Sequence, residues 1–172
     1  MTDRTALHPD AVALLGAVRD ALTPPEGATD QDVRDMTAYT SGFLSSVVED
    51  GTLNPSKGAD RLRGTARDHA HAVHVRALLA AEDAPAVQWR TTPTRLEAVL
   101  SQVDFTPQEQ LRGLAAWQRV LGAGPVQVRP TGVFEFHEIS GSFQGVEVTV
   151  STILRRPESA DEQDVPAGGE AA

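Results

Sequence analysis

The sequence predicts an α+β fold, in which an N-terminal helical unit precedes a three-stranded antiparallel meander backed by a helix. Apolar residues recur at helical spacing through residues 9–81, whereas residues 126–151 alternate apolar and polar side chains, as half-buried strands do. A helix with a strong start signal, over residues 106–121, leads directly into the alternating segment. We expect that helix to cover one face of the sheet.

The composition limits the classes of function. The 172 residues suit one domain or two small lobes, and the absence of cysteine excludes disulfides, thiolate metal sites and cysteine nucleophiles. A net charge of −9 opposes binding to nucleic acid and to anionic membranes. The most apolar run, residues 11–18, is too short to span a bilayer, and the N-terminus lacks a signal-peptide pattern. We therefore expect a soluble cytoplasmic protein without a membrane partner.

Three helices are expected in a first unit, residues 1–82. Pro9 suits the first position of the first helix, and Pro24-Pro25 ends it. The predicted apolar stripe of this helix consists of Ala11, Leu15, Val18 and Leu22.

The second predicted helix covers residues 30–50. Two aspartates in its first turn suit the helix dipole, and Gly51 stops it. The third helix begins with an N-cap at Asn54, followed by Pro55, and is expected to extend to about Ala81.

Residues 83–92 form the predicted linker, in which Val87 and Trp89 alternate with polar neighbours and allow a short extra strand. An α+β unit over residues 93–154 follows. Its first element is predicted as a short helix over residues 93–103, because apolar residues there share one helical stripe.

The next helix has the clearest start signal in the chain. Thr106-Pro107-Gln108-Glu109 is a capping box with proline at the first helical position. The predicted apolar side of the helix consists of Leu111, Leu114, Trp117 and Leu121.

Three alternating segments follow, at residues 126–129, 134–137 and 146–151. Gln144-Gly145 resembles a two-residue hairpin turn, which would place odd-numbered residues of the preceding strand on the core side. Phe134 and Phe136 have the opposite parity. We therefore predict either a bulge between about residues 137 and 141 or a longer loop through residues 140–142.

The last segment, residues 155–172, is polar and acidic and almost free of large apolar side chains. Such a segment cannot offset the entropy lost on ordering, so we predict a disordered tail.

His71 and His74 form a candidate metal site. They lie three residues apart in the third helix, share a face and could bind one ion together. Arg63 and Arg67 occur on the same face and repel a cation. The alternative interpretation is a solvated polar face, with His69 on the apolar side of the helix.

Glu135, His137 and Glu138 form a second candidate, because a carboxylate beside an imidazole can carry out acid–base chemistry. An exposed sheet face offers no pocket for a substrate. A cross-strand ladder of polar side chains on a solvated face is therefore the alternative interpretation.

Positive charge is concentrated in the third helix, at Lys57, Arg61, Arg63, Arg67 and Arg76. With the second helix, it could form a helix–turn–helix across residues 51–54. An aspartate near the start of the third helix, the absence of a base-reading cluster and the acidic chain all oppose nucleic-acid binding.

The stretches PDAVALLGAVRDAL, FTPQEQLRGLAAWQRVLG and GSFQGVEVTV resemble, in composition and in the order of elements, a class of short proteins rich in Ala, Val, Arg and Asp. Such proteins occur in high-GC actinobacteria and their phages. The resemblance implies a bacterial or phage-encoded setting. It implies no activity and no functional residues.

These observations favour a non-enzymatic protein-interaction protein, with an accessory or regulatory role, that binds a protein partner or forms a homo-oligomer. A small sheet leaves edges and a face for a partner, and Trp89, Arg63 and Arg67 are candidate contact residues. No cofactor and no catalytic residue is assigned. One alternative is a small metal- or ligand-dependent enzyme that uses the histidine and glutamate candidates. The other is a nucleic-acid-binding regulator that uses the arginine-rich helix.

Overall fold

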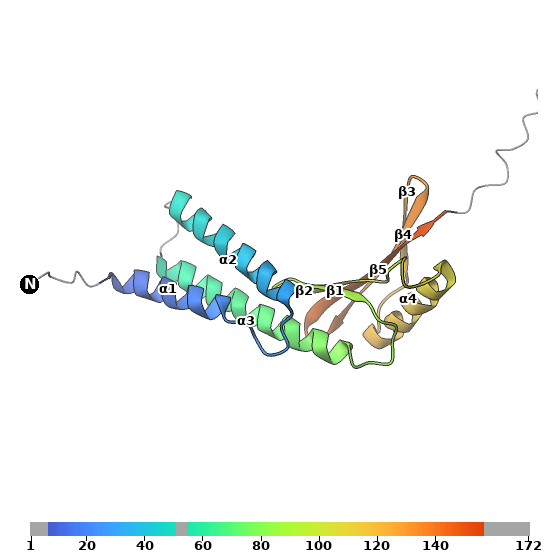
Figure 1. The fold of residues 1–172 in the computed structure, drawn as a ribbon, viewed down its shortest axis with the longest axis horizontal. Coiled ribbons are helices and arrows are strands. Elements are labelled where there is room, and N and C mark those ends of the chain that lie inside the picture. Colours follow the sequence, from blue (N-terminus) through green and yellow to red (C-terminus); the bar gives the residue numbers. More distant parts are fainter. Residues whose placement is uncertain (1–6, 51–54, 157–172) are drawn as a thin grey trace, which may run out of the picture.

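The structure is a computed structural model that describes residues 7–50 and 55–156 (Figure 1). These residues form an α+β fold with four helices and one five-stranded sheet. The helices are α1 (Pro9–Leu22), α2 (Asp30–Asp50), α3 (Pro55–Leu79) and α4 (Pro107–Leu121). The strands are β1 (Gln88–Thr91), β2 (Arg95–Val99), β3 (Gln127–Thr131), β4 (Phe134–Phe143) and β5 (Val146–Arg155). The predicted stop and cap at residues 51–54, and the predicted tail beyond residue 156, lie outside the described residues.

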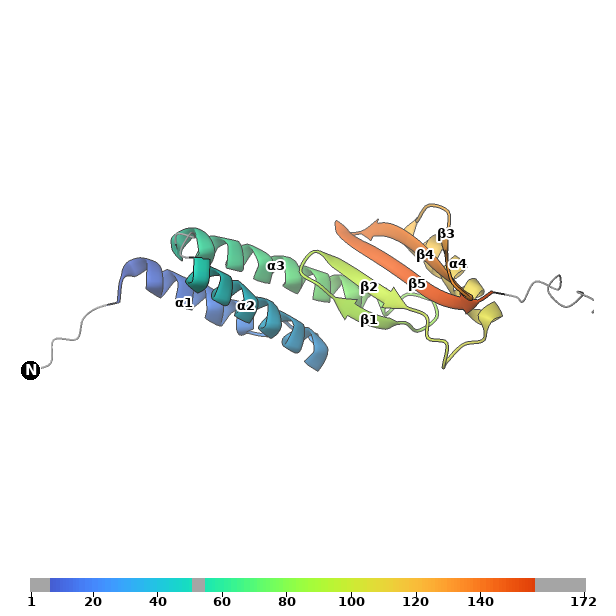
Figure 2. The same ribbon diagram turned by 90° about the horizontal axis from the view of Figure 1, so that it is seen from above.

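The molecule is elongated, with the helices α1, α2 and α3 at one end and the sheet with α4 at the other (Figures 1 and 2). The 25-residue helix α3 belongs to both ends, because it packs on α1 and α2 and then extends beneath the sheet. No helix of the described residues is long and apolar enough to cross a membrane.

The sheet has the strand order β1-β2-β5-β4-β3. The predicted antiparallel meander is present as β3, β4 and β5, but it is only part of the sheet. The hairpin of β1 and β2 adds two strands, and β2 pairs with β5 in parallel. The prediction of a three-stranded sheet is therefore incomplete, and the sheet is mixed.

The helix predicted for residues 93–103 is wrong, because strand β2 lies there. Leu96, Ala98 and Leu100 are buried in alternation, whereas Val99 and Val103 are 43% and 93% exposed. A short apolar run fits helical and strand spacing equally well. Pairing with β5, some 50 residues later in the chain, decides between them.

The predicted bulge and the predicted longer loop are both wrong. Strands β4 and β5 pair without interruption from Phe134 and Arg155 to Phe143 and Val146. Both residues of the connecting turn have positive φ, 49° and 82°, as a two-residue turn that follows the twist of the strands requires. The turn itself was predicted, and the regular ladder leaves no residue unpaired.

The parity conflict is resolved by the faces of the sheet. Ile139 of β4 and its partner Val150 of β5 point toward the helices, and so do Glu135 and His137, which have the same parity as Ile139 in β4. Phe134 and Phe136 therefore lie on the opposite face. The prediction had assigned the phenylalanines to the core and the two polar residues to solvent.

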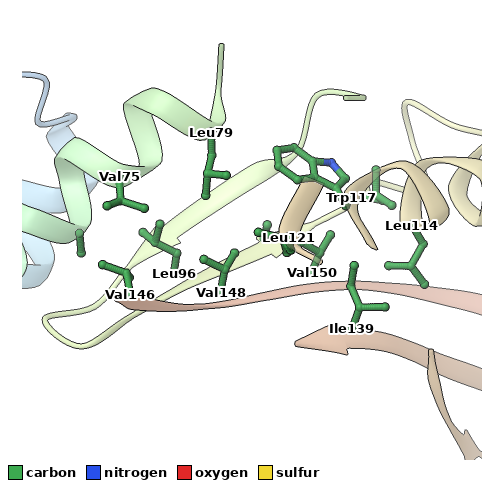
Figure 3. Packing of buried hydrophobic residues seen from close by; sticks show 13 residues of the cluster. Val75, Leu79, Leu96, Leu114, Trp117, Leu121, Ile139, Val146, Val148 and Val150 are labelled. Carbon is green, nitrogen blue, oxygen red and sulfur yellow. The ribbon is translucent and has the colours of Figure 1, made fainter. Parts of the chain in front are cut away.

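The main core lies between the sheet and the helices α3 and α4 (Figure 3). The capping box of α4 is confirmed, with Thr106 and Glu109 bonding to each other's backbone N–H. It orients Leu114 and Trp117 toward the strands, and the indole N–H of Trp117 donates to the carbonyl of Pro85 at 3.0 Å. Leu111, predicted on the apolar side, is 44% exposed.

A second, smaller core joins α1 to α2 and α3. The predicted stripe of α1 is shifted, because Leu15 and Leu22 are 58% and 43% exposed while Ala17 and Ala21 are buried. Ala59 of α3 is buried in the same cluster. Small side chains allow the helices to approach closely, so the alanines occupy the contact and the leucines lie at its margin.

One buried ion pair connects the helical bundle to the sheet. The Arg76 guanidinium of α3 donates to Asp32 of α2 at 2.5 Å, to the Thr91 hydroxyl of β1 at 3.1 Å and to the Gly27 carbonyl at 2.8 Å. Burial disfavours the charged form of Asp32, but hydrogen bonds from Thr29 and Arg76 outweigh it and lower the pKa from 3.8 to about 2. Asp32 is therefore ionised throughout the ordinary pH range.

Asp32→Asn is expected to lower the free energy of unfolding by about 3–5 kcal/mol, because it leaves the Arg76 charge buried without a counter-ion. The exposed Asp20→Asn should change it by less than about 0.5 kcal/mol. Urea unfolding at neutral pH measures both. Because the carboxylate pKa is lowered on folding, its stabilisation is present above pH 4 and is lost as the pH falls toward 2. The gap between wild type and Asp32→Asn should narrow over that interval, and a constant gap would contradict the assignment.

Gly141 of β4 marks a close approach between α4 and the sheet. A Cβ atom there would lie 3.1 Å from the Leu121 Cβ and 3.2 Å from the Leu121 carbonyl oxygen. Gly141→Ala should therefore lower the free energy of unfolding by about 1–3 kcal/mol. The neighbouring Ser142→Ala, on the open face of the strand, should change it by less than about 0.5 kcal/mol. Equal urea midpoints for the two variants would show that α4 can move away from the added methyl group without a loss of stability.

Candidate functional site

The face of the sheet turned away from α3 and α4 carries no helix (Figure 2). At its end farthest from the helical bundle, Phe134, Phe136 and Ile153 form an apolar surface that we call the distal patch. Phe134 is 41% and Ile153 40% exposed. With three residues of β3 they line a shallow hollow of about 560 Å³. The Arg129 guanidinium stands 4.9 Å from the centre of the Phe136 ring, so a charge borders the patch.

The rest of this face is mostly polar. Glu97 of β2 accepts from Arg95 at 2.7 Å and lies 3.9 Å from Arg90. Ser140 and Thr149 bond across β4 and β5 at 3.3 Å. Val99 is the large apolar residue exposed elsewhere on the face. In the distal patch, the partly exposed Phe134 and Ile153 lie beside Phe136. The distal end is therefore the part of the face most suited to contact with another molecule.

The two edges of the sheet are less suited to receive a strand. Thr131 and Phe134 flank a two-residue turn and pair with each other, so the backbone of Pro130 faces the free edge of β3. Proline has no N–H, and the edge lacks a donor there. The other edge, β1, has four residues and lies against α2 and α3. Neither edge therefore offers a long row of free backbone donors and acceptors to an added strand.

The predicted metal pair does not form a site with further ligands. The described residues contain no group of three or more His, Asp or Glu side chains that could hold a metal ion. His71 Nε2 lies 2.9 Å from the carbonyl oxygen of Gln144 in the β4–β5 turn. Since a carbonyl only accepts, this nitrogen carries a proton and has no lone pair for a metal. His74 is exposed.

The second predicted cluster is divided between the two faces. His137 Nε2 lies 3.2 Å from Glu135 Oε2 on the helix side of β4, and the same carboxylate lies 3.6 Å from Arg156. Glu138 is on the open face and accepts from Arg129 at 3.2 Å. His71 is near the other end of β4, about 24 Å away for seven residues of strand. The histidines and glutamates of the predicted enzyme site therefore do not converge.

The arginines of α3 do not form one continuous basic stripe. Arg76 is buried in the ion pair with Asp32. Arg63 lies 3.9 Å from Asp20 and 3.7 Å from Asp60, and it donates to a backbone carbonyl of α1. Arg67 is exposed beside Arg63 in a hollow of about 480 Å³ between α1 and α3. The remaining surface charge on this helix is thus partly balanced by carboxylates.

Trp89 is less available for contact than predicted. Its ring packs edge-on against Trp117, with 5.5 Å between the ring centres, and it borders the main core. The sequence pattern does not by itself indicate the distal patch, because the alternation of apolar and polar residues in β4 suggests that the two phenylalanines lie in the core. The hairpin turn at residues 144–145 contained the signal that could have found the patch, since it determines which parity faces the helices.

His69 is a buried imidazole between α2 and α3, on the apolar side of α3 as predicted. Neither ring nitrogen has a hydrogen-bond partner within the described residues. Burial lowers its pKa, and Arg76 acts in the same direction, while Asp32 and Asp35 oppose the shift. The side chain is therefore held neutral in the folded protein near pH 7.

Neither a protein-family model, nor a curated protein, nor a solved structure matches this chain. The geometry of the described residues is therefore the basis for any assignment of function.

The buried His69 predicts a loss of stability in mild acid. The unfolded chain binds a proton below about pH 6.5, and the folded chain resists it, so the free energy of unfolding falls as the pH falls below 6.5. The decrease is at most about 1.4 kcal/mol per pH unit, until the pH passes the pKa in the folded protein. The difference in urea midpoint between pH 7.5 and 5.5 should be smaller in His69→Leu than in wild type. The exposed His74→Leu should keep the wild-type difference, and an unchanged difference in His69→Leu would refute the prediction.

Proposed function

We propose that this chain is a non-enzymatic protein-interaction protein, of an accessory or regulatory kind, and that a protein partner binds the distal patch. The supporting observation is that Phe134 and Ile153 remain about two-fifths exposed on a face that no helix covers. Large apolar side chains grouped in this way are common where another surface binds.

The size of the patch limits the affinity it can supply. Completing the burial of two aliphatic or aromatic side chains that are already more than half buried stabilises a complex by about 1 kcal/mol each. A stable complex therefore needs further contacts, and Arg129 at the border of the hollow is suited to a carboxylate or an aromatic ring. This favours an accessory role with reversible binding.

The two alternative functions have less support. An enzyme would need the imidazoles of α3 and the Glu135–His137 pair in one pocket, and they lie at opposite ends of β4. A nucleic-acid regulator would need a basic helix face, and Arg76 and Arg63 are engaged with aspartates. Both remain hypotheses that binding and activity assays on the full chain can address.

Photo-crosslinking in the native host cell tests the proposal. A photoreactive phenylalanine analogue at position 134 should give one dominant cross-linked protein, identified by mass spectrometry. The same analogue at Gln88, on the open face but in the edge strand β1 on the opposite side of the sheet from β3, is the matched control and should give none.

A charge placed in the patch should abolish the product. Ile153→Asp should reduce the cross-link at position 134 at least fivefold, whereas Ser142→Asp, on the same face, should leave it unchanged. Equal yields from positions 134 and 88, or no product from either, would count against a docking site at the patch. A cross-link between two copies of the chain would identify the partner as a homo-oligomer.

A further inference from the structure

We propose that the distal patch is covered, in the absence of a partner, by the acidic segment of this chain over residues 157–172. The inference rests on the proposed function in that it assigns a regulation to the same surface. It follows from where the segment begins, from its charge and from its length.

The chain leaves the sheet beside the patch. Arg155, the last residue of β5, pairs with Phe134, and the backbone N–H of Arg156 donates to the Val133 carbonyl at 2.9 Å. The last described residue, Arg156, therefore lies next to the turn between β3 and β4. Ile153 is three residues back along β5, about 10 Å away. Eight extended residues span about 26 Å, which is sufficient to turn back and cross the hollow.

The charges of the two surfaces are complementary. Residues 157–172 contain five acidic residues and no basic one: Glu158, Asp161, Glu162, Asp164 and Glu170. Over the chain as a whole, acidic residues outnumber arginine and lysine by 24 to 15. The open face around the patch reverses this ratio, because β3, β4 and β5 place two arginines there, Arg129 and Arg155, against one glutamate, Glu138.

The acidic segment also contains an apolar anchor. Val165-Pro166 follows four of its carboxylates and could occupy the hollow between Phe134 and Ile153 while the carboxylates approach Arg129. A tethered segment has an effective concentration of the order of millimolar, so a weak intrinsic affinity is sufficient. A second copy docked face to face would instead bring the same arginines together, which favours the acidic segment as the occupant.

Paramagnetic labelling of the full chain tests the proposal directly. The chain has no cysteine, so Ala167→Cys provides a single site for a nitroxide. Ile153 and Leu154 are neighbours in the chain but lie on opposite faces of β5, which makes their methyl groups an internal control for the tether alone. A docked segment should broaden the Ile153 methyl signals at least threefold more than those of Leu154. Equal broadening would overturn the proposal.

Charge variants distinguish docking of the acidic segment from the proximity that its covalent attachment alone produces. In the labelled chain that also carries Glu158→Gln, Asp161→Asn, Glu162→Gln and Asp164→Asn, the methyl signals of Ile153 and Leu154 should be broadened equally. The labelled chain without these four substitutions should give the same result in 1 M salt. Arg129→Gln should reduce the difference between the faces, and Arg95→Gln, at the other end of the open face, should preserve it. A difference that survives neutralisation of all four acids would contradict the electrostatic basis of the proposal.

The same four-acid variant distinguishes this inference from the proposed function. If the segment covers the patch, neutralising it should raise the cross-linking yield at position 134 at least twofold. If the four-acid variant cross-links at the wild-type yield, and Ile153 and Leu154 are broadened equally in the labelled wild-type sequence, the proposed coverage is overturned and the proposed partner site is not. A difference between the faces with no cross-link in either form would support the coverage and overturn the partner site.

Discussion

The buried ion pair between Asp32 and Arg76 is the constraint on which the arrangement of the two ends depends. Arg76 also bonds to Thr91 of β1 and to the Gly27 carbonyl, so one guanidinium holds α2, α3, a loop and the edge of the sheet. A charge without water is tolerated only when its partners are correctly placed. The pair therefore selects the position of α2 along α3 and keeps the β1 edge against the helices.

With the β1 edge occupied, the fold buries one face of the sheet and leaves the other open. The helices α3 and α4 meet the face that carries Ile139, Val148 and Val150. The open face carries polar contacts between strands outside the distal patch. A chain with a net charge of −9 thus has its exposed aromatic surface beside arginines, a combination suited to an acidic partner with apolar anchors.

The composition of the candidate site depends on which residues of β4 face the helices. Phe134 and Phe136 of the distal patch were identified as part of a strand, and the turn at residues 144–145 was identified as well, whereas Ile153 lies beyond the predicted last strand. Because a strand has a period of two, assigning Phe134 to the core moved Glu135 and His137 to solvent. In the regular pairing of β4 and β5, Phe134 lies on the open face, and Glu135 and His137 lie on the helix side. What had been interpreted as core is the surface most suited to contact, and the glutamate–histidine pair is half-buried on the helix side.

Local signals in the sequence determined those elements whose energetics are local. The capping box of α4, the prolines that open α1 and α3, and the turn at residues 144–145 each act within a few residues. Tertiary structure decided the rest. Residues 95–99 became a strand because they pair with β5, and Ala17 displaced Leu15 from the helix contact because close packing favours a small side chain. Arg76 became a buried anchor because Asp32, 44 residues earlier, compensates its charge, and spacing along the chain does not reveal that partnership.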